Sequence, residues 1–140
     1  MYKIIVFTHG TLSKGLLETS ALILGEQPEI EVFSVELGCD LLDLKESVCK
    51  SLEKAEEEEK EVLVLTDLMY GTPFNTMVEL QKKYKFYHIT GVNLPMFLEA
   101  MNCRDTGTLK EVVEDIIDVA KNGVVDVQKL FEGMEVSNYK

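Results

Sequence analysis

Short apolar runs rich in β-branched residues alternate with longer amphipathic segments along most of the chain, and this alternation constrains the fold more than any other feature. The runs have the length of β-strands, and the segments between them have the length and spacing of helices. Strands separated by helices form βαβ units, whose right-handed crossovers produce a parallel sheet covered on both faces. The expected strands are Ile4–Phe7, Ile30–Val35, Val62–Leu65 and Phe86–Ile89. The expected helices are Leu12–Leu24, Leu41–Glu58, Phe74–Lys83, Pro95–Asn102 and Leu109–Lys121.

The continuity of this pattern indicates a single domain. A chain of 140 residues is about one domain long, and no repeat, low-complexity tract or Pro- and Gly-rich linker interrupts it. We therefore expect one α/β domain over residues 1–130, built on an open parallel sheet with helices on both faces. Residues 131–140 are expected to form a C-terminal tail.

The segment Val124–Val127 breaks the alternation. It is short and β-branched, and it follows Gly123 without a crossover long enough to make it another parallel strand of its own sheet. A strand left unpaired would expose hydrogen-bonding groups and apolar side chains. The segment is therefore expected to be an antiparallel edge strand, exchanged with the same segment of a second chain in a two-fold homodimer.

Composition excludes several classes of protein. The net charge of −11 argues against nucleic acid and anionic lipid as partners. The acidic run Glu56–Glu59 is typical of the solvated end of a helix, and it would also attract a basic partner protein. No apolar run approaches the roughly 20 residues that span a bilayer, and the first strand starts too early to leave room for a signal peptide. Cys39, Cys49 and Cys103 form no metal-binding or disulfide pattern, which predicts a cytoplasmic protein.

Polar turns that contain glycine follow three of the expected strands. They are Thr8–Thr11, Thr66–Asn75 and Gly91–Met96. Ligands of open α/β sheets bind beyond the carboxyl ends of the strands, and an imidazole there that faces a helix N-terminus is placed to handle an anion such as phosphate. These turns therefore predict the functional edge of the molecule.

His9 and Asp67 are the residues of this edge that are best suited to chemistry. In a sheet of order 2-1-3-4 the first and third strands are neighbours, so these two side chains converge. A carboxylate that binds one imidazole nitrogen fixes the tautomer and leaves the other nitrogen as a nucleophile for phosphorus. The alternative is that Asp67 caps a turn and that His9 is a partly exposed loop residue. His88, the only other histidine, and the turn residues Asn75 and Asn93 are expected to be structural.

Two nearby patterns concern phosphate. The segment Gly10–Gly15 has the G-xxxx-G spacing of a P-loop, but Leu16 and Leu17 replace the required Lys and Ser/Thr, which excludes that type of loop. Thr72 followed by Pro73 is typical of a helix N-cap and first turn. The free N–H groups of such a terminus also bind phosphate.

Three segments of the chain resemble the enzyme IIA component of mannose-class sugar phosphotransferase systems. They are Val6–Gly10, Leu65–Asn75 and Gly91–Met96, and the resemblance extends over roughly residues 1–130. The patterns G-[ST]-P-x-N and G-V-N-x-P-M within the last two segments carry most of its specificity. The resemblance implies a parallel sheet of order 2-1-3-4 and a homodimer in which a C-terminal strand pairs with the other subunit.

The same resemblance implies a role for each candidate residue. His9 would accept a phosphoryl group from the phosphocarrier protein HPr and pass it to a IIB component, with the membrane components IIC and IID involved only indirectly. Asp67 would orient the imidazole, and Gly10, Gly71 and Thr72 would hold the phosphate. No cofactor is expected.

Tyr70 departs from the family pattern, which usually has a glycine at this position. A tyrosine restricts the backbone where a positive φ is needed, which puts the geometry of the phosphate loop in question. Two other classes stay open at this point. One is a module whose phosphorylation regulates another protein, and the other is a flavodoxin-like ligand-binding protein.

Overall fold

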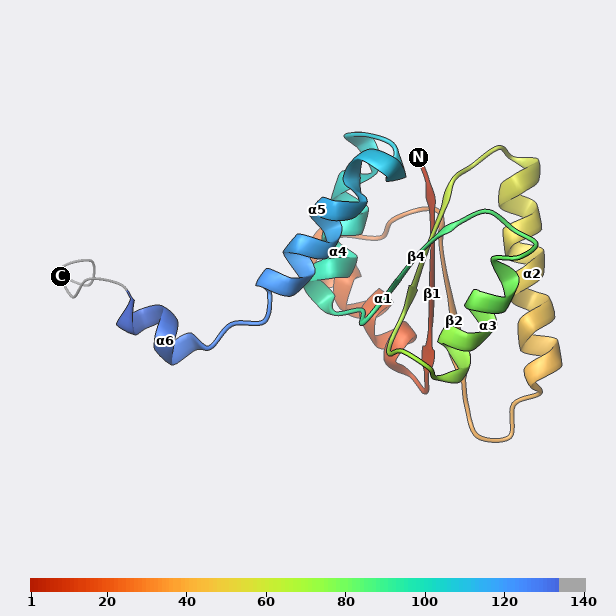
Figure 1. Ribbon diagram of the computed structural model, residues 1–140, viewed down its shortest axis with the longest axis horizontal. Helices are drawn as coiled ribbons and strands as arrows, with labels where there is room; N and C mark the ends of the chain where they lie inside the picture. The colour runs from red at the N-terminus through yellow and green to blue at the C-terminus, as the bar shows by residue number, and fades with distance from the viewer. Residues whose placement is uncertain (134–140) are drawn as a thin grey trace.

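Four parallel strands form the centre of the computed structural model, which describes residues 1–133 (Figure 1). The order of the strands is β2-β1-β3-β4, and every neighbouring pair is parallel. The predicted open parallel sheet of order 2-1-3-4 is confirmed. The strands are β1 Lys3–His9, β2 Ile30–Val35, β3 Val62–Thr66 and β4 Tyr87–Thr90.

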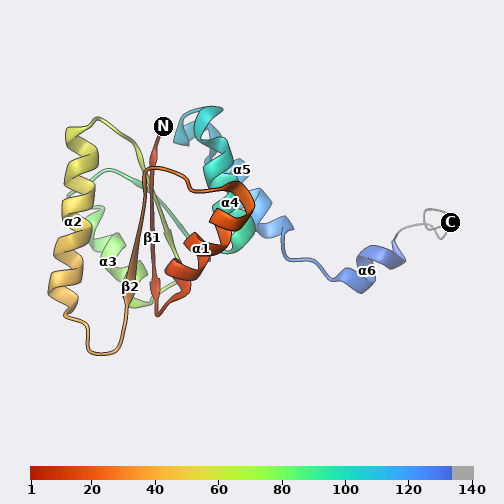
Figure 2. The ribbon, with the colours of Figure 1, turned by 180° about the vertical axis from the view of Figure 1, so that it is seen from behind.

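Helices cover both faces of this sheet. Figures 1 and 2 show α2 and α3 on one side and α1, α4 and α5 on the other. All five expected helices are present, although α3 starts at Thr72 and ends at Leu80, ahead of the expected Phe74 and Lys83. The helices are α1 Leu12–Leu24, α2 Leu41–Glu57, α3 Thr72–Leu80, α4 Leu94–Asn102, α5 Leu109–Asn122 and α6 Val127–Glu132, and a 3₁₀ turn, η1, covers Cys103–Asp105.

Alternate side chains of β1 enter two hydrophobic cores. Ile4 and Val6 pack with residues of α4 and α5, whereas Ile5 and Phe7 pack with residues of α2 and α3. All four side chains are fully buried, and each contributes about 1.5–3 kcal/mol through the removal of apolar surface from water. A strand that is buried on both faces needs a continuous apolar run, which explains the sequence of β1.

Polar side chains define where several helices begin. The Asp40 carboxylate accepts the Leu42 and Asp43 N–H groups at the start of α2. Thr108 and Glu111 form a capping box at the start of α5. Such caps satisfy N–H groups that have no partner within the helix, and each stabilises its helix by about 1 kcal/mol.

The C-terminal segment is not a strand in this structure. Residues 124–126 have no regular secondary structure, and α6 begins at Val127 and projects away from the body (Figures 1 and 2). The expected edge strand Val124–Val127 is therefore not formed within the single chain, and its exchange with a second chain stays a prediction. Asp126 favours the helix because its side chain accepts the Lys129 N–H as an N-cap. Of the expected tail over residues 131–140, positions 134–140 lie outside the described residues.

Candidate functional site

The ends of β1 and β3 bring His9 and Asp67 together. Asp67 Oδ2 lies 2.8 Å from His9 Nδ1 and also accepts the His9 backbone N–H at 2.9 Å. The second carboxylate oxygen, Oδ1, accepts the Leu68 N–H at 3.1 Å. These three hydrogen bonds hold the carboxylate in one orientation beside the imidazole.

The electrostatics of the pair determine which imidazole nitrogen is free. Burial by itself would raise the pKa of Asp67, but hydrogen bonds from the His9 backbone and ring, and the charge of that ring, outweigh burial and lower this pKa. The ionised carboxylate can only accept hydrogen bonds, so His9 Nδ1 must donate. In the neutral ring Nε2 then carries the lone pair, and the His9 side chain is 45% exposed. The arrangement leaves Nε2 as the candidate nucleophile on a partly exposed side chain.

The loop after β3 touches the imidazole at Gly71. A Cβ atom at this position would lie 2.6 Å from His9 Cε1 and 3.3 Å from His9 Nε2. The φ angle of Gly71 is −80°, which any residue can adopt. A glycine is therefore required here by the lack of space and not by the backbone conformation.

The N-terminus of α3 begins at the same contact. Gly71 is the N-cap, because its carbonyl accepts the Asn75 N–H at 2.9 Å, and Thr72 and Pro73 are the first helical residues. The expectation that Thr72 is the N-cap is wrong by one residue. Within residues 1–133 no side chain caps this terminus. The free N–H groups of a first turn and the helix dipole favour an anion at this position, beside His9.

Gly10 forms the turn from β1 into α1. Its φ of +55° is a left-handed conformation that glycine adopts without steric cost. Its N–H donates to the Val35 carbonyl at 2.8 Å, so this donor is already engaged. The space where a Cβ atom would stand is open.

Tyr70 has the positive φ that the family pattern put in question. Its φ is +65°, and the left-handed conformation costs a non-glycine residue about 1–2 kcal/mol. Two contacts offset this cost. The Tyr70 ring packs edge-to-face on Phe74 with 5.5 Å between the centroids, and the Tyr70 carbonyl accepts Asn75 Nδ2–H at 3.1 Å. Asn75 thus has the structural role expected of it.

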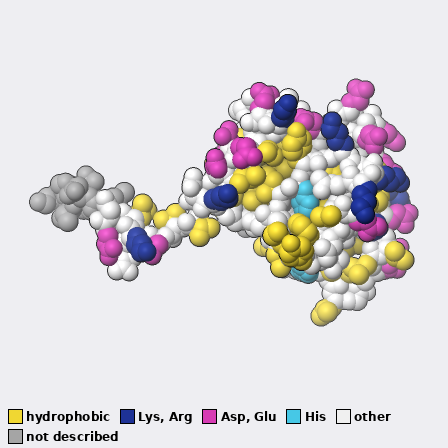
Figure 3. All heavy atoms as spheres, viewed as in Figure 1, with side chains coloured by type: hydrophobic (Ala, Val, Ile, Leu, Met, Phe, Trp, Pro, Cys, Tyr) yellow, Lys and Arg dark blue, Asp and Glu magenta, His cyan; other side chains and the backbone are white. Residues whose placement is uncertain are grey.

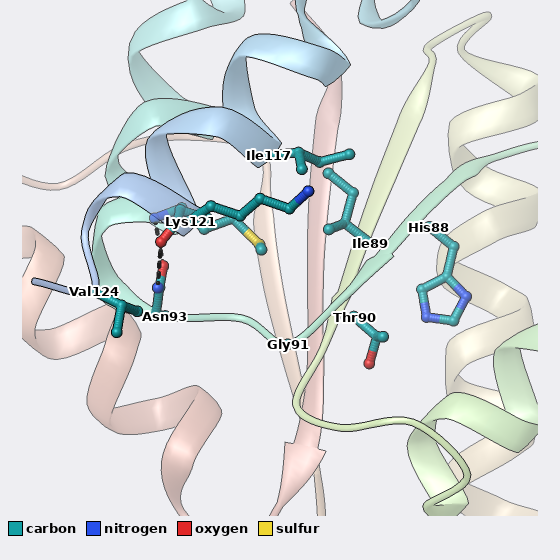
Figure 4. Close-up of a pocket in the computed structure, with 10 residues that line it drawn as sticks. His88, Ile89, Thr90, Gly91, Asn93, Ile117, Lys121 and Val124 are labelled. Atoms are coloured by element: carbon teal, nitrogen blue, oxygen red, sulfur yellow. Dashed lines mark hydrogen bonds between the residues drawn. The ribbon is translucent and has the colours of Figure 1, made fainter.

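His88 and Asn93 also have structural roles, as expected. His88 Nε2 lies 2.8 Å from the Thr66 hydroxyl, and burial lowers the pKa of the His88 imidazole, which keeps the ring neutral at pH 7. The Asn93 side chain accepts the Met96 N–H and donates to the Ala120 carbonyl, a contact drawn in Figure 4. Asn93 therefore caps α4 and ties it to α5.

Sequence reasoning missed the apolar character of the loop beside the site. Leu68 and Met69 are each more than half exposed, directly after Asp67. Two large apolar residues at the end of a strand, within an otherwise polar turn, were the available signal.

A pocket of about 440 Å³ lies away from His9, between β4 and the end of α5 (Figure 4). Its walls include Ile89, Ile117 and Ala120. Ile89 and His88 point to opposite sides of β4, so the His88 ring faces away from Ile89 and Ile117 (Figure 4). This apolar hollow therefore adjoins the outer edge of the sheet and not the candidate nucleophile.

The described part of the chain has neither a cluster of metal ligands nor a membrane-spanning helix. Residues 1–133 contain no group of three or more His, Cys, Asp or Glu side chains that could hold a metal ion. No helix in this range is long and apolar enough to cross a membrane. Cys39, Cys49 and Cys103 are free thiols, and burial together with the nearby Glu99 raises the pKa of Cys103 to about 11.

Three comparisons with known proteins find similar chains. The family model described as PTS system fructose IIA component matches residues 3–117. The fructose-specific EIIA component of Bacillus subtilis (strain 168) is 27% identical, over 99% of this chain and 94% of its own length. The mannose-specific EIIAB component of Escherichia coli (strain K12) is 32% identical over 86% of this chain, which spans 38% of that longer protein. The crystal structure of component EIIA from Streptococcus agalactiae matches with a TM-score of 0.85 and 32% identity, over 92% of this chain and 99% of that one.

Proposed function

The chain belongs to the family of PTS fructose IIA components and is a phosphoryl carrier for sugar uptake, and on that premise we propose that His9 is the residue that carries the phosphoryl group. One observation carries the proposal. Asp67 binds His9 Nδ1 at 2.8 Å, which leaves Nε2 as the other ring nitrogen of a partly exposed side chain. A neutral imidazole nitrogen with a free lone pair is the nucleophile that phosphoryl transfer requires.

In the proposed first step, His9 Nε2 attacks the phosphorus of a phosphoryl group on HPr. The N–P bond forms as the bond between phosphorus and the donor atom of HPr breaks, and the donor atom keeps the electron pair. The His9 ring gains positive charge, which Asp67 stabilises through Nδ1–H. In the second step a IIB component attacks the same phosphorus, and His9 leaves as a neutral imidazole. The membrane components IIC and IID take part only indirectly, and the IIA protein acts in the cytoplasm.

The start of α3 holds the phosphoryl group in this mechanism. Gly71 approaches His9 Nε2, and the first turn of α3, beginning at Thr72, has no side-chain cap among the described residues. Backbone N–H groups of Gly71 and Thr72 and the Thr72 hydroxyl would donate to the phosphate oxygens. The N–H of Gly10 is engaged by Val35, so the contribution of Gly10 is the left-handed turn that ends β1 beside the phosphate.

We also propose that two copies of the chain form a homodimer through the outer edge of β4. The folded domain of each copy is residues 1–130. Within residues 1–133, β4 pairs only with β3, and the apolar pocket lies alongside it. Val124 and Val125 are exposed and follow α5 directly. Pairing of this segment with β4 of a second chain would satisfy edge hydrogen bonds and cover apolar surface in both chains.

Phosphorylation by phosphoenolpyruvate, enzyme I and HPr tests the assignment of His9. We expect the protein to incorporate one phosphate that is labile to acid and stable to alkali, as a phosphohistidine is. His9→Ala should abolish labelling. His88→Ala, which removes the other histidine, should retain it. Labelling that survives in His9→Ala would overturn the proposal.

A further inference from the structure

We propose that Tyr70 is a positioning residue for the phosphoryl acceptor. Its ring holds the left-handed turn that lays Gly71 against the His9 imidazole. The inference rests on the proposed role of His9 and assigns to Tyr70 a role in setting the geometry around it.

The turn at Tyr70 and the contact at Gly71 are consecutive in the chain. Tyr70 has a φ of +65°, and the next residue approaches the ring so closely that its missing Cβ would lie 2.6 Å from His9 Cε1. The direction in which the backbone leaves position 70 therefore sets the distance between position 71 and the imidazole. It also sets the direction of α3, because Gly71 is the N-cap of that helix.

A column of three rings connects this turn to the sheet. The Tyr70 ring meets Phe74 at an interplanar angle of 70°, and Phe74 meets His88 with 5.5 Å between the centroids. His88 is in turn hydrogen bonded to Thr66 at the end of β3. In Figure 3, histidine and hydrophobic side chains lie next to one another on the face shown. The left-handed turn is thereby tied to β3 and β4.

The column explains how a tyrosine can occupy a left-handed position in this loop. Any L-residue at position 70 is disfavoured in that conformation, and here the ring contact with Phe74 offsets the cost. An alanine would keep the cost and the hydrogen bond from Asn75 but lose the ring contact, so we expect the turn to relax and Gly71 to move away from His9. A glycine adopts the conformation freely and would need no ring.

Three substitutions at one position separate this role from a direct contact with a partner. The measurements are the maximal rate of phosphoryl transfer from phosphorylated HPr (kcat) and the KM for that donor. We expect Tyr70→Ala to lower kcat roughly 10- to 100-fold, because displacements near 1 Å at a reacting centre have effects of this size. The KM should stay within about twofold of the wild-type value, since ground-state binding is unchanged. Tyr70→Phe keeps the ring and Tyr70→Gly restores the turn, so both should retain the wild-type kcat.

A variant at a second position makes the test independent of position 70, and a second readout makes it independent of HPr. Phe74→Leu removes the other half of the ring contact and should lower kcat as Tyr70→Ala does. In the unphosphorylated protein, the NMR resonance of the His9 Cε1 proton should shift in Tyr70→Ala and Phe74→Leu. It should keep its wild-type position in Tyr70→Phe and Tyr70→Gly. This spectrum requires neither HPr nor transfer.

The possible results lead to distinct conclusions. If Tyr70→Gly is as slow as Tyr70→Ala, or if only the KM rises, the ring acts as a partner contact and the proposal is wrong. A wild-type kcat and His9 resonance in Tyr70→Ala would also overturn it. Failure of the His9 assignment would instead be seen as labelling of His9→Ala, while the His9 resonance would still report the geometry.

Discussion

Asp67 accepts two hydrogen bonds from a single residue, because its Oδ2 atom receives both the backbone N–H and the ring Nδ1–H of His9. The ring and the main chain of His9 therefore share one anchor and cannot turn independently. The carboxylate fixes the tautomer of the imidazole and also fixes the end of β1 against the end of β3. The sheet sets the positions of the ends of β1 and β3, and these positions define the direction of His9 Nε2.

Asp67→Asn should slow phosphoryl transfer while leaving the fold intact. The amide is uncharged, so it cannot offset the positive charge that develops on His9, and its NH₂ group can favour the wrong tautomer. We expect the rate of transfer from HPr to fall roughly 10- to 1000-fold, because the backbone donors at the phosphate would remain. Asp118→Asn, on the exposed surface of α5, removes the same charge away from the site and is the control. A rate within twofold of wild type would remove Asp67 from the mechanism.

The stabilisation that Asp67 provides should disappear in acid. Its pKa in the folded protein lies below the ordinary value of 3.8, so the unfolded chain binds a proton at this carboxylate more readily than the folded chain. The contribution is fully present above about pH 5 and is lost as the pH falls through the folded pKa. The free energy of unfolding in urea should therefore differ most between wild type and Asp67→Asn at neutral pH, and the difference should shrink below about pH 4. A difference that stays constant from neutral pH into acid would contradict the role of the ionised carboxylate.

Gly71→Ala should damage the site more than the fold. The added methyl group would meet His9 Cε1 at 2.6 Å, so the loop or the imidazole must move. We expect transfer to slow roughly 10- to 100-fold and the free energy of unfolding to fall by about 1–3 kcal/mol.

Gly15→Ala is the matched control for Gly71→Ala. Gly15 lies within α1, and apart from its neighbours in that helix no heavy atom lies within 4 Å of its Cβ position. The Gly15→Ala variant should keep the wild-type rate of transfer. Its free energy of unfolding should rise by up to about 1 kcal/mol, because alanine favours a helix. Equal rates in the two variants would show that the contact with His9 is not needed.

Removal of the chain after Asn122 should destroy the proposed dimer. Val124 and Val125 are exposed in the single chain, and they are the residues proposed to pair with β4 of the second chain. Sedimentation should show the full-length protein as a dimer at micromolar concentration and the truncated protein as a monomer or an aggregate. Truncation after Gly133 leaves α6 in place and should preserve the dimer. A monomeric full-length protein, or an unchanged dimer after the longer truncation, would reject the exchanged segment.

The strands and helices were predictable because the order of apolar and polar residues along the chain reflects which residues of each element are buried. The continuous apolar run of β1 requires two covered faces, and the strands at Ile30–Val35 and Val62–Thr66 agree with the expected ranges to within one residue. The proximity of His9 and Asp67 followed as well, because right-handed crossovers leave few strand orders. The alternative, in which Asp67 caps a turn and His9 is a partly exposed loop residue, does not account for the 2.8 Å contact between their side chains, although Asp67 also accepts the Leu68 N–H.

The sequence by itself determined the sheet, its helices and the edge at which the polar turns gather, since hydrophobic periodicity records which faces are buried. Only the tertiary structure decided that Gly71 is needed for space, that Tyr70 takes a left-handed turn and that the chain enters α6 at Val127. The first feature arises from a contact across the fold, between the loop after β3 and His9 at the end of β1, and the second from ring contacts that run from Tyr70 through Phe74 to His88 on β4. Local propensity does not encode such contacts, because it is set by each residue and its nearest neighbours along the chain.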